Sequence, residues 1–83
     1  MDYKGIDFPV YRRLSNQKGF YKIIGPNEFD EIQLMGSKAF FHNTVSEKYP
    51  ELLRINDMVQ SEQPFEESSQ EEFEGLLDRY ALR

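Results

Sequence analysis

The sequence predicts a small α+β domain, in which an antiparallel sheet of three to four strands is covered on one face by two or three helices. Two observations lead to this prediction. Near the N-terminus, two stretches rich in aromatic and β-branched residues flank a polar loop that ends in glycine, as in a β-hairpin. Near the C-terminus, apolar residues recur with the i, i+3, i+4, i+7 spacing of an amphipathic helix. At 83 residues the chain has the length of one domain, 1–83, with residues 1–7 expected to be loosely ordered.

The predicted hairpin joins residues 8–14 to residues 20–24. Phe8, Val10 and Leu14 lie at alternate positions of the first stretch, although Arg12 interrupts this apolar face. Pro9 suits the start of a strand or an edge because it has no N–H to donate. The loop at 15–19 is polar until its final glycine. The second stretch consists of aromatic and β-branched residues around one lysine. Both stretches are therefore predicted to be antiparallel strands.

Residues 27–35 admit two interpretations. Ile32 and Leu34 alternate with polar neighbours, which indicates a strand, whereas Phe29, Ile32 and Met35 are spaced three apart, which indicates a helical stripe. An asparagine suited to the N-cap and acidic residues in the first turn favour the second interpretation. We therefore predict a short helix at 27–35.

Residues 38–45 are predicted to form the strand at the centre of the sheet. Phe40 and Phe41 are adjacent, so in a strand they point to opposite faces. Large apolar side chains on both faces indicate a strand that is covered on both sides. Residues 64–67 are a fourth candidate strand, a short one at an edge of the sheet.

Two further helices are predicted at 50–59 and 69–81. In the first, apolar residues lie along one helical stripe and a proline occupies the first turn, although Leu53 and Ile55 also alternate with polar residues as in a strand. The second begins with the capping-box spacing Ser-x-x-Glu at Ser69. Its first turns are acidic and its last turn is basic, which suits the helix dipole.

The predicted core relies on aromatic residues. A chain of this length buries a limited area, and it has no cysteine with which to reinforce a small core. Seven phenylalanines and five tyrosines supply much of the area that can be buried. The core is predicted to comprise Phe8, Val10, Leu14, Ile24, Phe29, Ile32, Phe41, Val45, Leu52, Phe73, Leu76, Leu77 and Tyr80.

A weak internal similarity relates residues 21–32 to residues 65–76. Each stretch has an aromatic residue followed by an acidic-Phe-acidic triplet and then an aliphatic residue, with the same spacing in both. So few matching positions do not establish a repeat.

No pattern in the sequence indicates catalysis or a bound cofactor. Cysteine is absent, and His42 is the single histidine, with no acidic residue within four positions of it, whereas zinc sites need three or four clustered donors. The glycines are isolated, so neither common phosphate-binding motif occurs. Serines and the threonine lie mostly at expected turns and caps. We therefore predict that the protein is not an enzyme and has no catalytic residues, metal site or cofactor.

The charge distribution is uneven and suggests an interaction surface. Residues 1–25 carry five basic and two acidic side chains, whereas residues 26–83 carry five basic and thirteen acidic ones. Basic and aromatic residues coincide in the N-terminal hairpin. The sequence therefore predicts a non-catalytic protein-interaction or adaptor module, with an unknown protein partner or self-association. The alternative is a minor nucleic-acid-binding module, which the acidic balance of the whole chain disfavours. The predicted surface comprises Tyr11, Arg12, Arg13, Lys18, Tyr21 and Lys22.

The sequence also bears on location. No apolar run approaches the roughly 20 residues that span a bilayer, and no apolar segment of the leader type follows Met1. The lack of cysteine fits a reducing compartment. We expect a cytoplasmic protein without a membrane partner.

Overall fold

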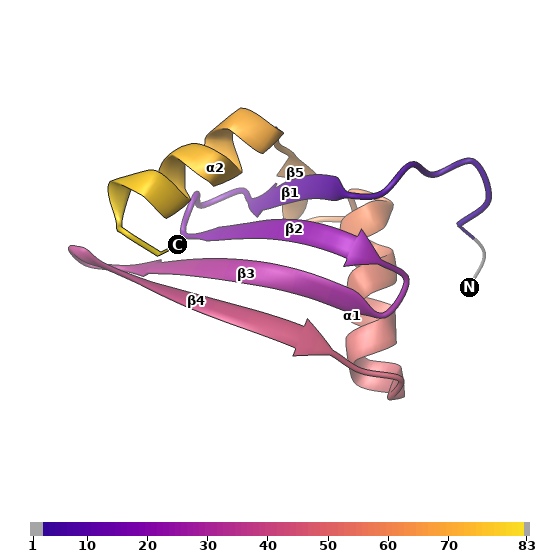
Figure 1. Cartoon of the computed structure of the whole chain (residues 1–83). Helices are drawn as coiled ribbons and strands as arrows, with labels where there is room; N and C mark the ends of the chain where they lie inside the picture. Colours follow the sequence, from indigo (N-terminus) through magenta and orange to yellow (C-terminus); the bar gives the residue numbers. More distant parts are fainter. Residues whose placement is uncertain (1–2, 83) are drawn as a thin grey trace.

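The computed structural model describes residues 3–82, which form one sheet of five strands and two helices (Figure 1). Four strands of high β-propensity come first, and α-helical segments follow them, with one short strand between the two helices. The elements are β1 (Val10–Leu14), β2 (Gly19–Gly25), β3 (Glu28–Met35), β4 (Lys38–Val45), α1 (Tyr49–Val59), β5 (Phe65–Glu67) and α2 (Gln70–Arg79). The α+β class predicted from the sequence is confirmed, with one more strand than the largest number expected.

The sheet has the order β4-β3-β2-β1-β5, and every pair of neighbours is antiparallel. The first four strands form a meander joined by short turns. Gly36, with φ of +63°, occupies the two-residue turn between β3 and β4, where a side chain would be strained. The register places Arg12, Tyr21, Glu31 and His42 in one row across four strands. Facing residues on neighbouring strands point to the same side of the sheet, and side chains alternate between the two sides along each strand. This row therefore shows to which face each side chain of the four strands points.

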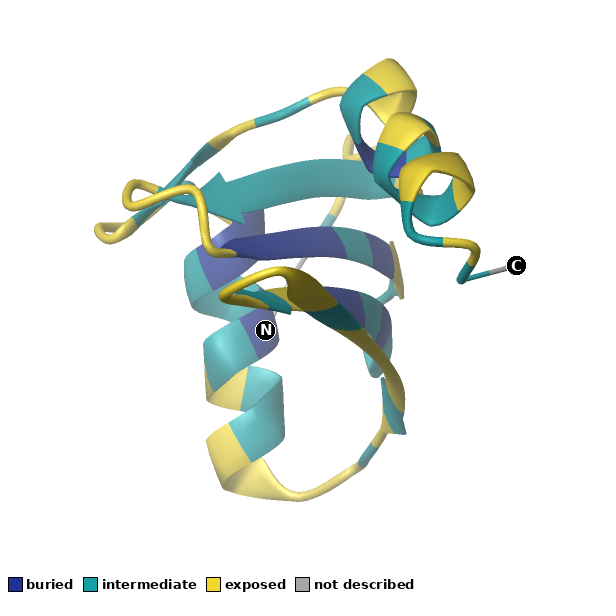
Figure 2. Ribbon diagram, turned by 90° about the vertical axis from the view of Figure 1, so that its left-hand side faces the viewer, coloured by how far each residue is buried: buried dark blue, intermediate teal, exposed yellow. Residues whose placement is uncertain are grey.

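The two helices lie on opposite faces of the sheet, as Figure 2 shows from the side. Adjacent residues of β2 document this arrangement: Tyr21 packs with α1, whereas Phe20 packs with Phe73 of α2. The expectation that the helices share one face is therefore wrong. The reason is that β2 carries large apolar side chains on both of its faces, and each face needs its own cover.

Each helix covers its own core cluster. On the α1 side, the buried residues are Tyr21, Ile23, Phe29, Ile55, Met58 and Val59. On the α2 side, they are Phe20, Ile32 and Phe73, with half-buried side chains around them. Both clusters centre on β2 and β3, so the outer strand β4 lies largely beyond their cover.

The predicted helix at 27–35 is wrong, because this segment is strand β3. Phe29 and Ile32, three residues apart, are both fully buried, but on opposite faces of the sheet. In a strand covered on both sides, apolar residues at a spacing of three imitate a helical stripe. In the similarity between 21–32 and 65–76, residues 28–32 of strand β3 therefore correspond to residues 72–76 of helix α2, so the two stretches differ in secondary structure.

The other predicted elements are confirmed, with small differences at their ends. The strand at 38–45 has the expected bounds, the hairpin strands are 10–14 and 19–25, and the short edge strand is 65–67. The helices predicted at 50–59 and 69–81 span 49–59 and 70–79. Ser69 is the N-cap of α2 and accepts a hydrogen bond from the backbone N–H of Glu72 at 3.1 Å. Of the segment expected to be loose, residues 1–2 lie outside the described residues, and the Tyr3 ring contacts that of Phe8 edge to face.

The predicted core needs three corrections, at Ile24, Phe41 and Val45, whose exposed fractions are 36%, 39% and 61%. The prediction that residues 38–45 occupy the centre of the sheet is also wrong, since β4 is at an edge. Phe29, Ile32 and Phe73 are buried as expected. The remaining predicted core residues are half-buried: Phe8, Val10, Leu14, Leu52, Leu76, Leu77 and Tyr80.

Candidate functional site

The structure divides the predicted basic and aromatic surface between two faces of the sheet and a turn. Tyr11 faces Lys22 across β1 and β2 on the α2 side, whereas Arg12 faces Tyr21 on the α1 side. Lys18 is exposed in the turn between these strands. Side chains on opposite faces of a sheet cannot contact one ligand together, so these residues do not form a continuous surface.

Both arginines of β1 have contacts within the protein. Arg12 donates from Nε to the carbonyl of Met58 at 2.9 Å and from Nη2 to the carbonyl of Val59 at 3.0 Å, which satisfies carbonyls at the C-terminal end of α1. Burial lowers the pKa of Arg12. Arg13 pairs with Glu66 at 2.8 Å and with Glu72 at 2.9 Å, and these partners raise its pKa. The two arginines therefore link β1 to α1, to α2 and to the neighbouring strand β5.

A buried polar cluster lies between the sheet and α1. The Glu31 side chain is 7% exposed and accepts a hydrogen bond from Arg54 Nη2 at 2.9 Å. The same nitrogen donates to the Tyr21 hydroxyl at 3.2 Å, and the guanidinium lies over the rings of Tyr21 and Phe29. Gly19 borders the cluster, because a Cβ there would stand 2.9 Å from the Tyr21 hydroxyl. Tyr21 is 2% exposed and the Glu31 side chain 7%, whereas the Arg54 side chain, at 41%, reaches the surface. The cluster therefore joins α1 to the buried face of the sheet.

This cluster predicts a specific dependence of stability on pH. Burial, followed by the charge of Glu31, raises the pKa of Tyr21 from 10.0 to about 12. The proton is held more tightly in the folded state, so the associated stability is complete below pH 10 and is lost as the pH rises towards 12. Between pH 9 and pH 11, urea titrations should show wild type losing on the order of 1 kcal/mol more stability than Tyr21→Phe. Equal losses in the two proteins would contradict the assigned cluster.

The outer strand β4 presents an open edge with large apolar side chains. Among residues 3–82, β4 has a neighbouring strand on one side only, as Figure 1 shows. The exposed fractions are 43% for Phe40, 39% for Phe41 and 61% for Val45. Phe40 points to the α1 side, whereas Phe41 and Val45 point to the α2 side. Each face at this edge therefore exposes a phenylalanine.

The hydrogen-bond pattern identifies which backbone groups face outward. Ser46 donates from its N–H to the carbonyl of Asn27 at 3.0 Å, in continuation of the β3–β4 register. Leu34 of β3 donates its backbone N–H to the carbonyl of Lys18 at 2.9 Å, so the backbone groups of even-numbered β3 residues face β2. The backbone groups of odd-numbered β3 residues therefore face β4. Hydrogen-bonded pairs alternate along an antiparallel ladder, so even-numbered residues of β4 bond to β3. Outward N–H and C=O groups belong to Ala39, Phe41, Asn43 and Val45.

The two edges of the sheet differ in their protection against further pairing. At the far edge, β5 is three residues long, follows Pro64 and carries Glu66 and Glu67. Short length, proline and charge all hinder the addition of another strand. By contrast, β4 is eight residues long and its sequence contains neither proline nor an acidic residue. Lys38, at its start, is its one lysine or arginine.

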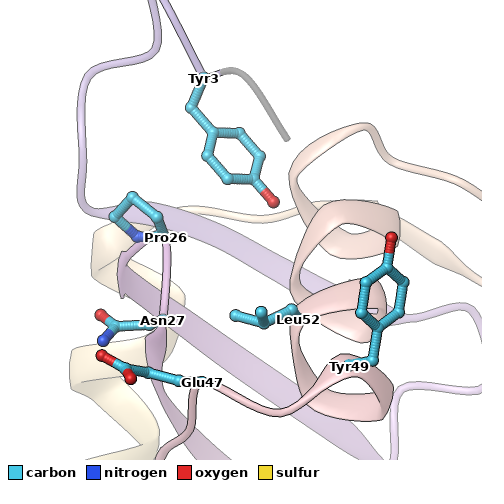
Figure 3. A pocket seen from close by; sticks show the side chains of 6 residues that line it. All are labelled: Tyr3, Pro26, Asn27, Glu47, Tyr49 and Leu52. Carbon is cyan, nitrogen blue, oxygen red and sulfur yellow. The ribbon is translucent and has the colours of Figure 1, made fainter.

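An open pocket lies just beyond the end of β4, beside the first turn of α1 (Figure 3). Its volume is about 280 Å³, just below the range of about 300–1,000 Å³ typical of ligand sites. Figure 3 shows Leu52 pointing from α1 towards Asn27, which lies in the turn between β2 and β3, and Glu47 lies beside Asn27. The lining residues are Tyr3, Pro26, Asn27, Glu47, Tyr49 and Leu52. Glu47 supplies a carboxylate close to the open edge.

Sequence reasoning misses the open edge, because the phenylalanine pair of β4 favours a strand covered on both sides. The signal in the sequence that could have indicated an unprotected edge is the absence of Asp, Glu, Lys and Arg from residues 39–45.

Within residues 3–82, no three acidic or histidine side chains gather as metal ligands. In the same range, no helix has the length and apolar character needed to cross a membrane. Comparison of the chain with protein-family models, with curated proteins and with solved structures yields no match.

Proposed function

We propose that the protein is a non-catalytic protein-interaction module that binds an extended segment of its partner as a sixth strand beside β4. The observation that carries this proposal is the unprotected edge of β4, where four residues direct backbone groups outward and a phenylalanine is exposed on each face. Addition of a strand at such an edge is a known mode of peptide recognition, in which backbone hydrogen bonds give affinity and side chains give specificity.

The chemistry of the edge favours a partner with apolar side chains. A strand that pairs with β4 would cover parts of Phe40 and Phe41 that are now in water, at about 25 cal/mol for each Å² of apolar area removed. The added backbone hydrogen bonds contribute about 0.5–1.5 kcal/mol each. Nucleic acid is a less suitable partner, because Arg12 and Arg13 are engaged within the fold and β4 has one lysine.

Two variants of the edge test this proposal. Tagged protein is used to capture partners from a native lysate, with Phe41→Lys and Val45→Lys as edge variants and Leu53→Lys as the control. Leu53 is 47% exposed on α1, so its variant introduces the same charge on an exposed apolar site away from the strand. Circular dichroism checks that each variant is folded.

We expect partners captured by wild type to be retained by Leu53→Lys and lost by both edge variants. A lysine at either position places a charge where the added strand would exclude water. Capture that is unchanged in the edge variants, or that is lost equally in the control, would refute binding at β4.

A further inference from the structure

We infer that the partner of β4 is the β4 strand of a second copy of this chain, so that two sheets join about a two-fold axis into one continuous antiparallel sheet. This inference rests on the proposed function and names its partner. It follows from three properties of the strand: the positions of its outward backbone groups, its side-chain pattern and the charges at its two ends.

The outward backbone groups determine the register of self-pairing. They belong to odd-numbered residues, so an antiparallel copy must place odd residues opposite odd residues. A two-fold axis beside His42 pairs Ala39 with Val45 and Phe41 with Asn43, which uses the outward groups of all four residues. A shift of this axis by one residue towards the start of the strand leaves Val45 opposite position 37, outside the strand, and a shift the other way leaves Ala39 opposite position 47. The register centred on His42 is therefore the one that satisfies the most backbone groups.

The side chains of this register are compatible on both faces. On the α2 side, Ala39 lies opposite Val45, and Phe41 lies opposite Asn43, whose amide already donates to Asp30 at 2.8 Å. On the α1 side, Phe40 lies opposite Thr44, and His42 faces its own copy. Because β4 contains no carboxylate, no acidic side chain of the strand faces another across the axis. This property matters for a chain of net charge −5.

The charges at the ends of β4 favour a second copy in the antiparallel orientation. Lys38 is exposed at one end of the strand, and Glu47 is exposed just past the other. In the register centred on His42, Lys38 lies opposite Ser46 of the second copy, one residue from its Glu47. Lys48, which precedes α1, is one residue further along. The symmetry creates the Lys38–Glu47 contact twice, whereas parallel pairing would place Lys38 beside Lys38.

The pocket beside α1 lies where this contact would form. Glu47 lines it together with Tyr49, which is 73% exposed. Lys38 is on the α1 side of the sheet, as its register with Met35 shows, and the pocket adjoins α1 on that side. Lys38 of the second copy would approach this region from the α1 side, where the carboxylate of Glu47 attracts its ammonium group.

A charge-exchange experiment tests this interface directly. The oligomeric state of wild type, Lys38→Glu and Glu47→Lys is measured by analytical ultracentrifugation over a wide range of concentration. Wild type should form dimers, and each single variant should weaken dimerisation about tenfold, because both symmetric contacts become repulsive.

An equimolar mixture of the two variants supplies the decisive arm. When one chain carries Lys38→Glu and the other carries Glu47→Lys, both contacts of the mixed dimer again join a carboxylate to an ammonium group. One contact has its charges exchanged, and the other has the charges of wild type. Mixed dimers should therefore form as tightly as wild-type dimers, whereas Lys18→Glu, which makes the same charge change two strands away from β4, should have little effect.

Each outcome separates this inference from the proposed function. Wild type that stays monomeric throughout, or a mixture that associates no better than its components, overturns self-pairing in this register. If partner capture still depends on Phe41 in that case, the edge binds a different protein and the proposed function stands. If neither association nor capture responds to Phe41→Lys, both proposals fail. Dimers that respond to none of the variants would place the interface elsewhere and also overturn the inference.

Discussion

Replacement of Phe29 by alanine is expected to lower the free energy of unfolding by about 3–5 kcal/mol. The ring is fully buried, lies 6.2 Å from the Tyr21 ring between centroids, and is covered by the Arg54 guanidinium at 5.3 Å. A domain of 83 residues has a total stability of about 4–12 kcal/mol, so this loss removes at least about a quarter of it and, at the lower end of the range, all of it. Urea denaturation followed by circular dichroism measures the change.

Phe40→Ala is the matched control for this prediction. It removes the same side chain from an exposed position at the edge, where 43% of the residue is in water. Its cost should therefore stay near or below about 1 kcal/mol. Similar losses for the two variants would mean that β3 and β4 do not occupy the inner and outer positions described.

Replacement of Arg54 by methionine is expected to destabilise the fold by about 2–3 kcal/mol, because it leaves the carboxylate of Glu31 buried without its cation. The Glu31 side chain is 7% exposed, and the Gln33 amide, at 3.3 Å, is its remaining partner on β3. The Arg54 side chain is itself 41% exposed, which reduces the loss below that of a fully buried ion pair. Chemical denaturation at neutral pH measures this loss.

A double variant distinguishes the lost charge pair from lost packing. In Arg54→Met/Glu31→Leu, neither charge of the pair remains, and stability should return to within about 1 kcal/mol of wild type. If the loss of stability in the double variant equals the sum of the losses in the two single variants, the two side chains are not coupled, and the contact between β3 and α1 is wrong.

Local signals in the sequence are sufficient for most elements. The helix at 70–79 has a capping serine, an acidic first turn and a regular apolar stripe, and all three act within a few residues of one another. The strand at 38–45 follows from its aromatic and β-branched content. Such elements are predictable because the interactions that define them are close in sequence.

The segment at 27–35 requires information from distant residues. Phe29 is buried by α1 and Ile32 by α2, so the apolar pattern of β3 reflects two covering layers and not one. Glu31, between them, is a charged residue in the interior, and its partner Arg54 lies 23 positions away in the chain. Neither covering layer can be recognised from the residues of β3 alone, so its periodicity is ambiguous.

The predicted interaction surface has a related difficulty. Basic and aromatic residues of the hairpin are candidates because of their chemical type, yet Arg12 and Arg13 satisfy carbonyls and carboxylates of α1, β5 and α2. The candidate edge, in contrast, depends on strand order. If β4 lay at the centre of the sheet, the same residues would be buried. Strand order is a property of long-range pairing that composition does not determine.

Amide hydrogen exchange by nuclear magnetic resonance, at low and high protein concentration, tests the pairing of β4 most directly. In dilute solution the amides of Phe41, Asn43 and Val45 should exchange rapidly, while those of Phe40, His42 and Thr44 are protected by β3. At high concentration the first three should become protected as well, because the second copy accepts their hydrogen bonds. If these three amides exchange at the same rapid rate over the whole concentration range, the outer edge of β4 does not pair with another copy of the chain.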